Sequence, residues 1–361
     1  MISEIWLKSF RNYKNLNLEL LSGIHLLVGK NGQGKSNFLE AIYLFSYLKS
    51  FRKSSDKELI PHSSQHYYLK GAFENEDIQS IEMGYESNGK AIKMDGKKTA
   101  AIMEAVGKIR TVLFSDTDIE LLYGAPVVRR SYMDATLSVT DKNYLYSLHH
   151  YKKVLKMRNA AIKSFLEGKG NKDSVRAWDN QLIRYGSYII TRRNDFIENI
   201  AKICRNLYPR FTTHQLEMNL KYSPSFKWEN DSIEKTYENY LEKEFTQELR
   251  KATTLLGPHR DEISIKNKNF LLKKFASKGQ ARAACLILKL AQLEYLEKNR
   301  DAKCILLLDD VLLDLDNENK RNFIQILGSE RQCFFTATSV EEFCGLQGHL
   351  YEVKEGNIRK I

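Results

Sequence analysis

The sequence lacks the features that mark membrane-spanning and secreted proteins. None of its apolar stretches approaches the roughly 18 residues that a membrane-spanning helix needs. Glu4 and Lys8 stand in an N-terminal region without a long apolar segment, so we expect no secretory signal peptide. The five cysteines are scattered and lack CxxC spacing, and Cys285 and Cys304 lie within apolar runs. We therefore expect reduced, buried thiols in a cytoplasmic protein that has no membrane partner.

Internal repeats, low-complexity tracts and sustained heptad arrays are also absent, which leaves a globular fold as the expectation. Of the 361 residues, 42% are hydrophobic and 28% are charged. That composition supplies a core for one large domain or two modest ones, and it is too rich in apolar residues for a disordered chain.

Positive charge is concentrated in one part of the chain. The net charge is +11, and residues 141–210 alone contain 15 Lys/Arg against 6 Asp/Glu. A basic segment of this kind is expected of a protein that binds a polyanion. The alternative is a solvated helical face that serves only solubility, and charge by itself does not separate the two.

The order of the expected elements predicts an interrupted α/β fold. Apolar runs of strand length occur at both ends of the chain, and the stretch 66–97 alternates like an antiparallel meander. Between these ends, residues 127–210 are basic and favour helix. We predict that residues 1–120 and 251–361 form the two halves of one sheet domain, and that residues 121–250 form a helical, basic lobe inserted into it. Further strands are expected at 214–222, 262–266, 269–273 and 304–308, and helices at 278–298 and 317–327.

A glycine-rich loop follows the apolar run that ends at Val28. Residues 29–36, GKNGQGKS, fit the pattern G-x-x-x-x-G-K-[ST]. Glycines let backbone N–H groups close around phosphate oxygens, and the next helix directs its positive end at the same phosphates. Lys35 would add a catalytic positive charge and Ser36 a ligand for Mg²⁺. An ordinary glycine-rich turn is the alternative, but the flanking strand and helix favour ATP. The predicted ATP contacts in this loop are Gly29, Lys30, Asn31, Gly32, Gln33, Gly34, Lys35, Ser36 and Asn37.

Two adjacent acids, Asp309 and Asp310, follow the apolar run at 305–308. Four branched apolar residues in succession are typical of a strand covered on both faces. A phosphate-binding loop requires an acid for Mg²⁺ at the end of such a neighbouring strand. We predict that Asp309 binds Mg²⁺ together with Ser36, and that Asp310 faces the attacking water as the catalytic base. A pair of helix-capping aspartates is the alternative.

A second helix start has the composition of an anion site. Ser277 precedes Gly279, Gln280 and an apolar helix. Serine caps helices well and an open N-terminus attracts anions, so the segment suits either an ordinary core helix or a phosphate contact. Because the loop at 29–36 already cradles a nucleotide, the second contact would be made to the nucleotide of another copy of the chain.

Taken in order, these motifs resemble those of ABC-type P-loop ATPase heads, the group that includes SMC proteins. Ser-x-Gly-Gln at 277–280 resembles the signature, the paired acids resemble Walker B, and Leu315-Asp316 resembles the D-loop. Within that group the chain resembles the RecF family of bacterial recombination-repair proteins over nearly its whole length. The matching blocks are FRNYKNL (10–16), NGQGKSNFLEAIYLFS with KSFR (31–52), ELLYGAPVVRRSYMD (120–134), LKMRNAAIK (155–163), WDNQLIRYG (178–186), GPHRDEI (257–263) and LLLDDVLLDLD (306–316).

Three blocks depart from the pattern of that family or group. Ala276 precedes the signature serine where leucine is usual, and FSDTDIELL lacks the usual proline and glutamate. FFTATS stands where transporters carry a switch histidine. The last departure agrees with the RecF family rather than with a transporter.

The resemblance implies an ATP-dependent homodimer that clamps DNA, as duplex or at duplex/single-strand junctions, and works at the nucleoid. It also implies a weak DNA-stimulated ATPase that helps load recombinase at gaps in recombinational repair and replication restart, with RecR and RecO as partners. Further ATP contacts implied by the resemblance are Arg11, Asn12, Ser277, Lys278, Gly279, Gln280 and Asp316. Asp310 stands where many such heads carry glutamate, and its shorter reach predicts slow basal hydrolysis.

Basic side chains of the inserted lobe are candidate DNA contacts, with a structural or merely solvated role as the alternative for each. They are Arg129, Arg130, Lys152, Lys153, Lys156 and Arg158. For His259, in GPHRDE, we expect structural hydrogen bonding rather than catalysis.

Two competing functions are an SMC-like or transporter-type ABC subunit with another partner and a P-loop kinase. Long coiled-coil arms and a switch histidine are absent, and 274 residues separate Lys35 from Asp309. The absent arms and switch histidine weigh against the ABC subunit, and the long separation weighs against the kinase.

Overall fold

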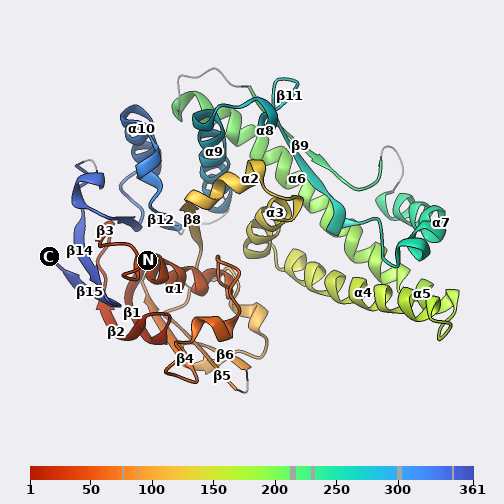
Figure 1. Cartoon of the computed structure of the whole chain (residues 1–361), viewed down its shortest axis with the longest axis horizontal. Coiled ribbons are helices and arrows are strands. Elements are labelled where there is room, and N and C mark those ends of the chain that lie inside the picture. Colours follow the sequence, from red (N-terminus) through yellow and green to blue (C-terminus); the bar gives the residue numbers. More distant parts are fainter. Residues whose placement is uncertain (75–76, 88, 212–216, 229–231, 299–302, 344) are drawn as a thin grey trace. The chain divides into compact units, whose positions relative to one another are not determined.

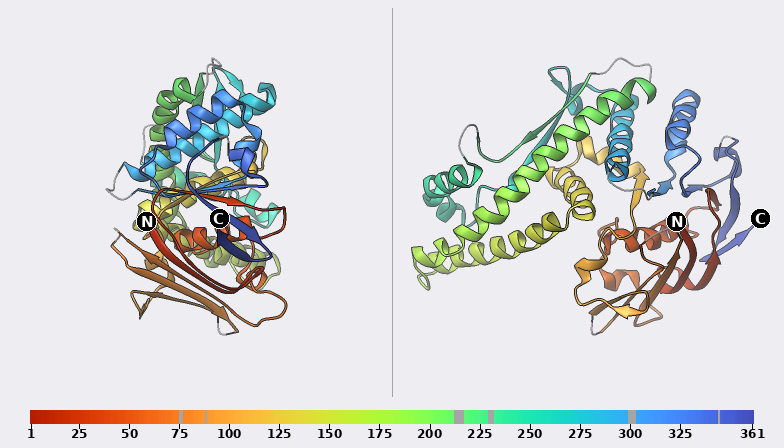
Figure 2. Two further views of the ribbon diagram at one scale, coloured as in Figure 1. Left: turned by 90° about the vertical axis from the view of Figure 1, so that its left-hand side faces the viewer. Right: turned by 180° about the vertical axis from the view of Figure 1, so that it is seen from behind.

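The computed structural model describes residues 1–74, 77–87, 89–211, 217–228, 232–298, 303–343 and 345–361. Its contacts divide the chain into two units (Figures 1 and 2). The sheet unit contains Met1–Ile119, Asn206–Gln215 and Ser277–Ile361. The helical unit contains Glu120–Arg205 and Leu216–Ala276.

A six-stranded, mostly parallel sheet lies at the centre of the sheet unit. Its order is β15-β14-β3-β13-β12-β8, and only the pairing of β15 with β14 is antiparallel. The strands are β3 (Ile24–Val28), β8 (Thr111–Ser115), β12 (Ile305–Asp309), β13 (Cys333–Ala337), β14 (His349–Lys354) and β15 (Asn357–Lys360). Every residue of β8 and β13 is buried, which explains why these segments carry no charged residue and do not alternate.

A second, antiparallel sheet of the same unit contains the N-terminal strands and the predicted meander. Its order is β2-β1-β4-β5-β6-β7. The strands are β1 (Ile2–Phe10), β2 (Tyr13–Glu19), β4 (Tyr67–Phe73), β5 (Ser80–Glu86), β6 (Gly89–Met94) and β7 (Lys97–Lys98). Strand β4 alternates strictly between buried and half-buried residues, so this sheet buries one face more deeply than the other.

Helix α1 (Lys35–Tyr47) lies between the two sheets. It contacts β8, β12 and β13 of the parallel sheet and β4 of the antiparallel sheet. Phe38, Ile42 and Phe45 have no exposed surface and belong to one apolar cluster with residues of both sheets. Because α1 begins at the glycine-rich loop, this core also fixes the position of the loop.

Two helices from the C-terminal part of the chain complete the sheet unit. Helix α9 (Lys278–Glu297) packs against β8, and α10 (Asn317–Leu327) places Phe323 against Phe114 and Phe211, with ring centroids 5.3 and 6.3 Å apart. Short 3-10 turns connect the elements: η1 (Asp56–Leu59), η2 (Ile102–Ala105), η3 (Asp116–Ile119), η5 (Val311–Asp314) and η6 (Val340–Phe343).

The helical unit combines long helices with a small antiparallel sheet of order β11-β10-β9. Its helices are α2 (Glu120–Tyr123), α3 (Pro126–Thr140), α4 (Lys142–Leu166), α5 (Lys172–Arg176), α6 (Asp179–Phe211), α7 (Ile233–Lys251) and α8 (Leu272–Phe275). Its strands are β9 (Met218–Ser223), β10 (Glu262–Asn267) and β11 (Phe270–Leu271), and the turn η4 (Pro258–Arg260) precedes β10. The residues of α6 from Asn206 onward group with the sheet unit.

The predicted architecture is confirmed, since strands from both ends of the chain share the parallel sheet around an inserted helical segment. The limits of the insertion differ from the prediction. Residues 251–276 group with the helical unit, because β10 pairs with β9 and packs against α3. The strand predicted at 269–273 is wrong beyond Leu271, where the chain turns into α8. The strand predicted at 214–222 begins at Met218, and residues 214–216 lie outside the described residues.

The cysteines agree with the expectation of reduced core thiols. Cys204, Cys285, Cys304 and Cys333 are buried and free, and Cys344 lies outside the described residues. In the part of the chain that the structure describes, no helix has the length and apolar character needed to cross a membrane.

Candidate nucleotide-binding site

The glycine-rich loop leaves the end of β3, between β13 and β14 of the parallel sheet. Gly29 passes so close to β14 that a Cβ atom would collide with the Val353 carbonyl oxygen. Gly34 has φ +118°, and a Cβ there would lie 2.6 Å from the Asn12 side-chain nitrogen. Both positions therefore require glycine, the first for close approach and the second also for its left-handed backbone.

Lys35 begins α1 and folds back onto the loop. Its ammonium group donates to the carbonyl oxygens of Gly29 (2.6 Å) and Lys30 (3.2 Å), and its side chain is buried. Lys30, Asn31 and Gly32 are exposed. The loop thus combines exposed backbone with a positive charge held at its centre, which is the arrangement that a polyphosphate requires.

Two asparagines and a tyrosine hold the loop in place. Asn12 Nδ2 donates to the Gln33 carbonyl oxygen (2.8 Å), and Asn12 Oδ1 accepts from Asn37 Nδ2 (2.8 Å). The Tyr13 hydroxyl donates to the Gly34 carbonyl oxygen (2.9 Å). Asn12 therefore acts on the loop backbone, and its amide is committed to protein groups in this structure.

Arg11 is engaged in a buried ion pair. Its Nε and Nη2 atoms donate to the two carboxylate oxygens of Glu40 (2.8 and 2.9 Å), and it also donates to Ser54 Oγ and the Glu58 carbonyl oxygen. Glu40 has no exposed surface. Loss of Arg11 would leave that charge uncompensated. Arg11 thus ties the β1–β2 turn to α1, a structural role that the sequence did not predict.

Ser36 and Asp309 meet, as expected of two groups that share a metal ion. Ser36 Oγ donates to Asp309 Oδ1 (2.8 Å), and the Thr336 hydroxyl, at the end of β13, lies 2.9 Å from the same oxygen. Burial raises the pKa of the Asp309 carboxyl, while the two hydroxyl contacts and the charge of Arg52 oppose that rise. A serine hydroxyl beside a carboxylate at the phosphate loop fits the oxygen ligands that Mg²⁺ prefers.

Asp310 has an uncommon backbone conformation, with φ +53°. Its N–H donates to Thr336 Oγ1 (2.9 Å), and the same hydroxyl oxygen lies 3.0 Å from Asp310 Oδ1. A backbone of this kind persists where the surroundings hold the residue. Thr336 therefore contacts both predicted site acids and fixes their relative positions.

Arg52 is a site residue that the sequence analysis missed. Its Nη1 donates to Asn37 Oδ1 (2.7 Å) and lies 4.0 Å from Glu40 Oε2. Its side chain remains 38% exposed, and its charge opposes the rise in the pKa of Asp309 that burial causes. The KSFR block contains Arg52, but a lone arginine after a helix carries no spacing that identifies a phosphate site.

The predicted signature segment caps α9. The Gln280 N–H donates to Ser277 Oγ (3.2 Å), and the Ser277 N–H donates to Gln280 Oε1 (3.0 Å), which forms a capping box. Ser277, Lys278 and Gly279 are exposed, and open space surrounds the position of a Cβ on Gly279. The start of α9 is therefore accessible to an anion from outside the chain.

Asp316 is the N-cap of α10. Its carboxylate accepts from the N–H and Nδ2 groups of Asn319 (2.9 and 2.6 Å), and the hydrogen bond from that N–H is the main cause of its lowered pKa. Helix capping, which was the alternative role for Asp309 and Asp310, is thus the role of Asp316. Its contact with ATP stays a prediction.

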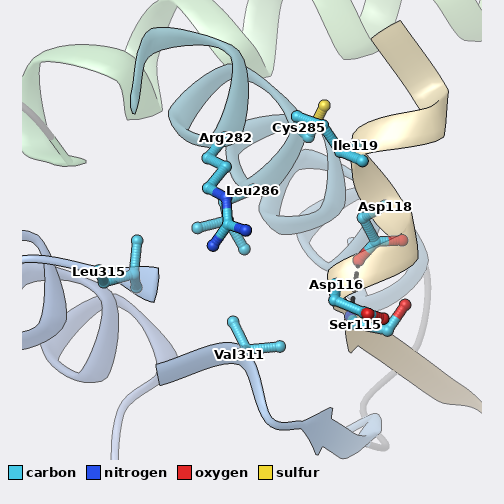
Figure 3. A pocket seen from close by; sticks show the side chains of 9 residues that line it. All are labelled: Ser115, Asp116, Asp118, Ile119, Arg282, Cys285, Leu286, Val311 and Leu315. Atoms are coloured by element: carbon cyan, nitrogen blue, oxygen red, sulfur yellow. Dashed lines mark hydrogen bonds between the residues drawn. The ribbon is translucent and has the colours of Figure 1, made fainter. Parts of the chain in front are cut away.

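A small cavity lies between α9 and the segment after the paired acids (Figure 3). Its lining residues are Ser115, Asp116, Asp118, Ile119, Arg282, Cys285, Leu286, Val311 and Leu315. The volume of about 30 Å³ holds water but no nucleotide. Burial raises the pKa of Asp118, and Lys289 lies 3.9 Å from it. The candidate nucleotide site is therefore the exposed loop rather than this cavity.

Arg158, predicted as a DNA contact, lies inside the helical unit. It is fully buried and pairs with Asp179 and Glu248, each at 2.7 Å. The prediction is wrong, because the guanidinium neutralises two carboxylates of its own unit. Glu248 has no exposed surface, and burial raises its pKa against the opposing charge of Arg158.

The prediction for Arg129 is wrong for the same reason. Its side chain is buried, and its Nη2 donates to Glu262 Oε2 (2.7 Å) in a two-pronged pair. Lys152, Lys153 and Lys156 are exposed on α4 and remain candidates for DNA.

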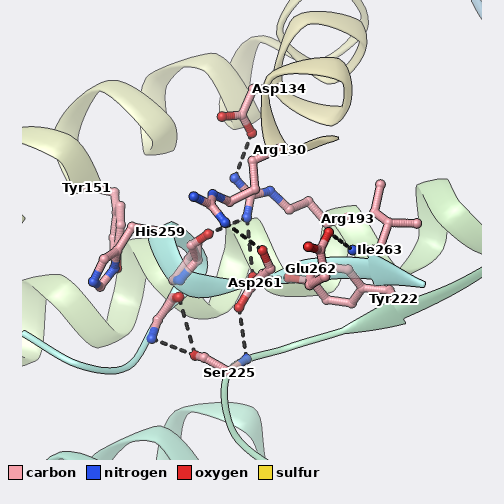
Figure 4. A network of polar contacts seen from close by, with 12 residues as sticks. Arg130, Asp134, Tyr151, Arg193, Tyr222, Ser225, His259, Asp261, Glu262 and Ile263 are labelled. Carbon is pink, nitrogen blue, oxygen red and sulfur yellow. Dashed lines mark hydrogen bonds and ion pairs between the residues drawn. The ribbon is translucent and has the colours of Figure 1, made fainter. Parts of the chain in front are cut away.

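A buried network around Arg193 connects the GPHRDE block to the helices (Figure 4). Arg193 donates to Asp134 Oδ1 (2.7 Å), the Pro258 carbonyl oxygen (2.6 Å) and Asp261 Oδ2 (3.2 Å). Arg130, half-buried, donates to the Asp261 carbonyl oxygen (2.8 Å). The block is thus a structural junction of the helical unit, and Arg130 is only partly available to DNA.

His259 also has a structural role, as expected. Its Nδ1 lies 2.7 Å from the Tyr151 hydroxyl and its Nε2 lies 3.1 Å from the Thr254 carbonyl oxygen. A neutral ring with its proton on Nε2 satisfies both contacts.

Stability is expected to depend on pH through His259. Burial lowers its pKa from 6.5 to about 4, so the unfolded chain takes up the proton first as the pH falls. The free energy of unfolding is therefore highest above pH 6.5, and it falls by about 3 kcal/mol as the pH is lowered to 4. His259→Gln removes this titration, so urea unfolding between pH 7 and pH 4 should show a smaller loss in the variant. His25, whose pKa is also lowered to about 4, is present in both proteins, so its contribution cancels in the comparison. Identical pH profiles would therefore show that His259 does not cause the loss of stability.

Comparisons with known proteins agree with this geometry. Residues 1–357 match the family model described as RecF/RecN/SMC N terminal domain. The chain is 37% identical over 349 residues to the DNA replication and repair protein RecF of Caldanaerobacter subterraneus subsp. tengcongensis, covering 95% of this chain and 96% of that protein. A solved structure of the recombination mediator protein RecF with ATP, described in the RecFOR pathway, superposes with a TM-score of 0.92 at 35% identity, over 100% of this chain and 97% of that one. An Smc head domain from Pyrococcus furiosus matches in fold alone, with a TM-score of 0.54 at 15% identity, over 100% of this chain and 95% of that one.

Proposed function

This chain belongs to the RecF family of DNA replication and repair proteins, and we propose from that premise that it acts as an ATP-dependent homodimer that closes on DNA. In this role it helps to load recombinase at single-strand gaps. The observation that carries the proposal is a hydrogen bond at the phosphate loop, in which Ser36 Oγ lies 2.8 Å from Asp309 Oδ1. The solved relative with ATP supports the choice of nucleotide.

ATP binds across the loop at residues 29–36. Lys35 leaves the two loop carbonyls that it contacts and turns its ammonium group to the β- and γ-phosphates. Ser36 and Asp309 would hold Mg²⁺, which would neutralise charge on those phosphates. Asp310 accepts the proton of the attacking water, and its short side chain keeps turnover slow.

The second copy of the chain completes the site. The start of α9 presents Ser277, Lys278 and Gly279 to the γ-phosphate held by its partner. ATP then stabilises the dimer because it binds both copies at once, and hydrolysis releases them. The capping box of Ser277 and Gln280 keeps this helix end ordered before the partner arrives.

Duplex DNA binds to the basic surface of the helical unit. The exposed lysines of α4 are Lys152, Lys153 and Lys156. Arg129 and Arg158 instead form ion pairs inside the helical unit. Phosphate contacts of this kind release counterions, so affinity falls as salt rises. Retention of DNA that neither needs ATP nor weakens with salt would contradict the clamp.

Removing the three α4 lysines is expected to flatten the salt dependence. In the variant Lys152→Gln, Lys153→Gln, Lys156→Gln, the slope of log K against log salt should fall by about 0.9 for each lost duplex contact. Fluorescence anisotropy with labelled duplex and ATP, across a salt series, measures this slope.

A matched variant controls for the change in net charge. Lys14→Gln, Lys97→Gln, Lys98→Gln removes three exposed lysines of the antiparallel sheet, and its slope should stay at the wild-type value. Equal slopes in both variants would show that α4 holds no phosphate contacts.

RecR and RecO are the proposed protein partners. The support is that the solved relative is described as part of the RecFOR pathway. The ATP-bound dimer on DNA is the state to which they would bind. Titration of each partner into ATP-bound protein on DNA tests this, and binding that ignores ATP and DNA would contradict it.

A further inference from the structure

Two phenylalanine side chains project from the end of the small sheet in the helical unit. We call residues 266–275, which comprise the end of β10, β11 and α8, the aromatic hairpin. Phe270 is 63% exposed and Phe275 is 68% exposed, the highest values for large apolar side chains in the described part of the chain. Their rings meet edge to face with centroids 5.6 Å apart. Because burial of a phenylalanine stabilises a fold by about 1.5–3 kcal/mol, a contacting exposed pair indicates a binding surface.

The aromatic hairpin is also strongly basic. Lys266, Lys268, Lys273 and Lys274 are exposed, and none forms an ion pair among the described residues. The sequence has no acidic residue between Glu262 and Glu294. Glu262 is already paired with Arg129. The aromatic hairpin therefore carries four uncompensated ammonium groups, which favour an anionic ligand.

A cavity of about 230 Å³ adjoins the hairpin. Leu271 and Lys273 of the hairpin line it together with Leu122, Arg129, Glu262, Ile263, Ser264 and Ile265. Its walls are apolar apart from the Arg129–Glu262 pair, the Ser264 hydroxyl and the Lys273 ammonium group. A mixed apolar and polar recess of this kind accepts a flat ring that carries hydrogen-bonding edges.

We propose that the aromatic hairpin binds unpaired nucleotides of single-stranded DNA. Bases stack on Phe270 and Phe275, phosphates contact the lysines, and the neighbouring cavity takes a base turned out of the strand. Duplex DNA does not fit this surface as well, because its bases are stacked on one another and offer no free ring face.

This inference rests on the proposed binding of DNA and adds a second contact to it. The α4 lysines bind the duplex and the aromatic hairpin binds the adjoining unpaired strand, so that a duplex/single-strand junction binds more tightly than either part alone. The added affinity follows from linkage of two contacts on one ligand.

The variant Phe270→Ala, Phe275→Ala tests the inference. Its affinity is compared by fluorescence anisotropy on a blunt duplex and on the same duplex with an oligothymidine tail. The wild-type protein should prefer the tailed duplex. The variant should lose at least roughly 30-fold in affinity for it, because each of the two stacked bases contributes about 1–3 kcal/mol, while its affinity for blunt duplex stays unchanged. Phe270→Tyr, Phe275→Tyr should retain the preference, and so should Leu166→Ala, which removes a half-exposed leucine elsewhere in the same unit.

Other results separate the aromatic hairpin from the duplex clamp. Unchanged affinity of the alanine variant for tailed duplex, or an equal loss on blunt and tailed duplex, would overturn the inference. Loss of ATP-dependent dimerisation with intact binding of tailed duplex would overturn it in favour of a contact between copies. Wild-type protein that binds the tailed duplex but not the blunt one would leave the aromatic hairpin in place and defeat the duplex clamp. Failure to bind either DNA would defeat both.

Discussion

Replacing Asp310 by asparagine is expected to stop ATP turnover while ATP remains bound. Asparagine keeps the size of the side chain and tolerates the left-handed backbone at φ +53°, but it accepts no proton from the attacking water. Loss of a general base typically slows turnover by 10²- to 10⁴-fold, so we expect a decrease of at least about 100-fold. The ATP-bound dimer should then persist, which light scattering and phosphate release measure together.

A matched variant separates this chemistry from backbone effects. Asp95 also has a positive φ, +49°, and accepts hydrogen bonds from the N–H groups of Gln79 and Ser80 in the antiparallel sheet. Asp95→Asn should leave turnover unchanged. If Asp310→Asn turns over ATP at the wild-type rate, another residue is the base, and Thr336 and Asp309 are then the groups to test.

Replacing Ser277 by arginine is expected to abolish ATP-dependent dimerisation without abolishing ATP binding. The change removes the cap of α9 and places a bulky cation at the open helix end where the partner's phosphate would dock. The phosphate loop is untouched, so binding of a fluorescent ATP analogue should survive. Light scattering of the 41.9 kDa chain should then show monomers with and without ATP.

Ser232→Arg controls for the loss of a helix cap. Ser232 caps α7 in the helical unit through a hydrogen bond from the Lys235 N–H (3.2 Å). This variant should lose stability to a similar degree and still dimerise with ATP. Dimers of Ser277→Arg that form with ATP as readily as the wild type would show that the start of α9 does not face the partner's nucleotide.

The sequence predicted the parts of the site that depend on local pattern. The glycine-rich loop needs closely spaced glycines, and the paired acids follow an unbroken apolar run, so both are visible without a fold. The meeting of Ser36 with Asp309 followed from one assumption, that β3 and β12 end at the same edge of a parallel sheet. The structure places β13 between them, and Thr336 at its end contacts both acids.

The errors lie where a side chain's partner comes from a distant segment. Arg158 stands in a basic helix that suggested DNA, but Glu248 reaches it from α7 and makes it a core residue. Arg129 is likewise neutralised by Glu262 of β10. Helical periodicity shows that a residue lies on a face, whereas it does not show which element covers that face. The pairing of Arg11 with Glu40 and the contact of Arg52 with Asn37 were not predicted for the same reason.

The composite site made by two copies is the central claim, and mixing two inactive variants tests it most directly. Lys35→Ala disables the phosphate loop and Ser277→Arg disables the start of α9, so neither protein should dimerise alone. In a mixed dimer, the intact loop of the Ser277→Arg chain meets the intact α9 of the Lys35→Ala chain. With a donor dye on one variant and an acceptor dye on the other, ATP should produce energy transfer in the mixture. Absence of ATP-dependent transfer, while the wild-type protein shows it, would contradict a site shared between two copies.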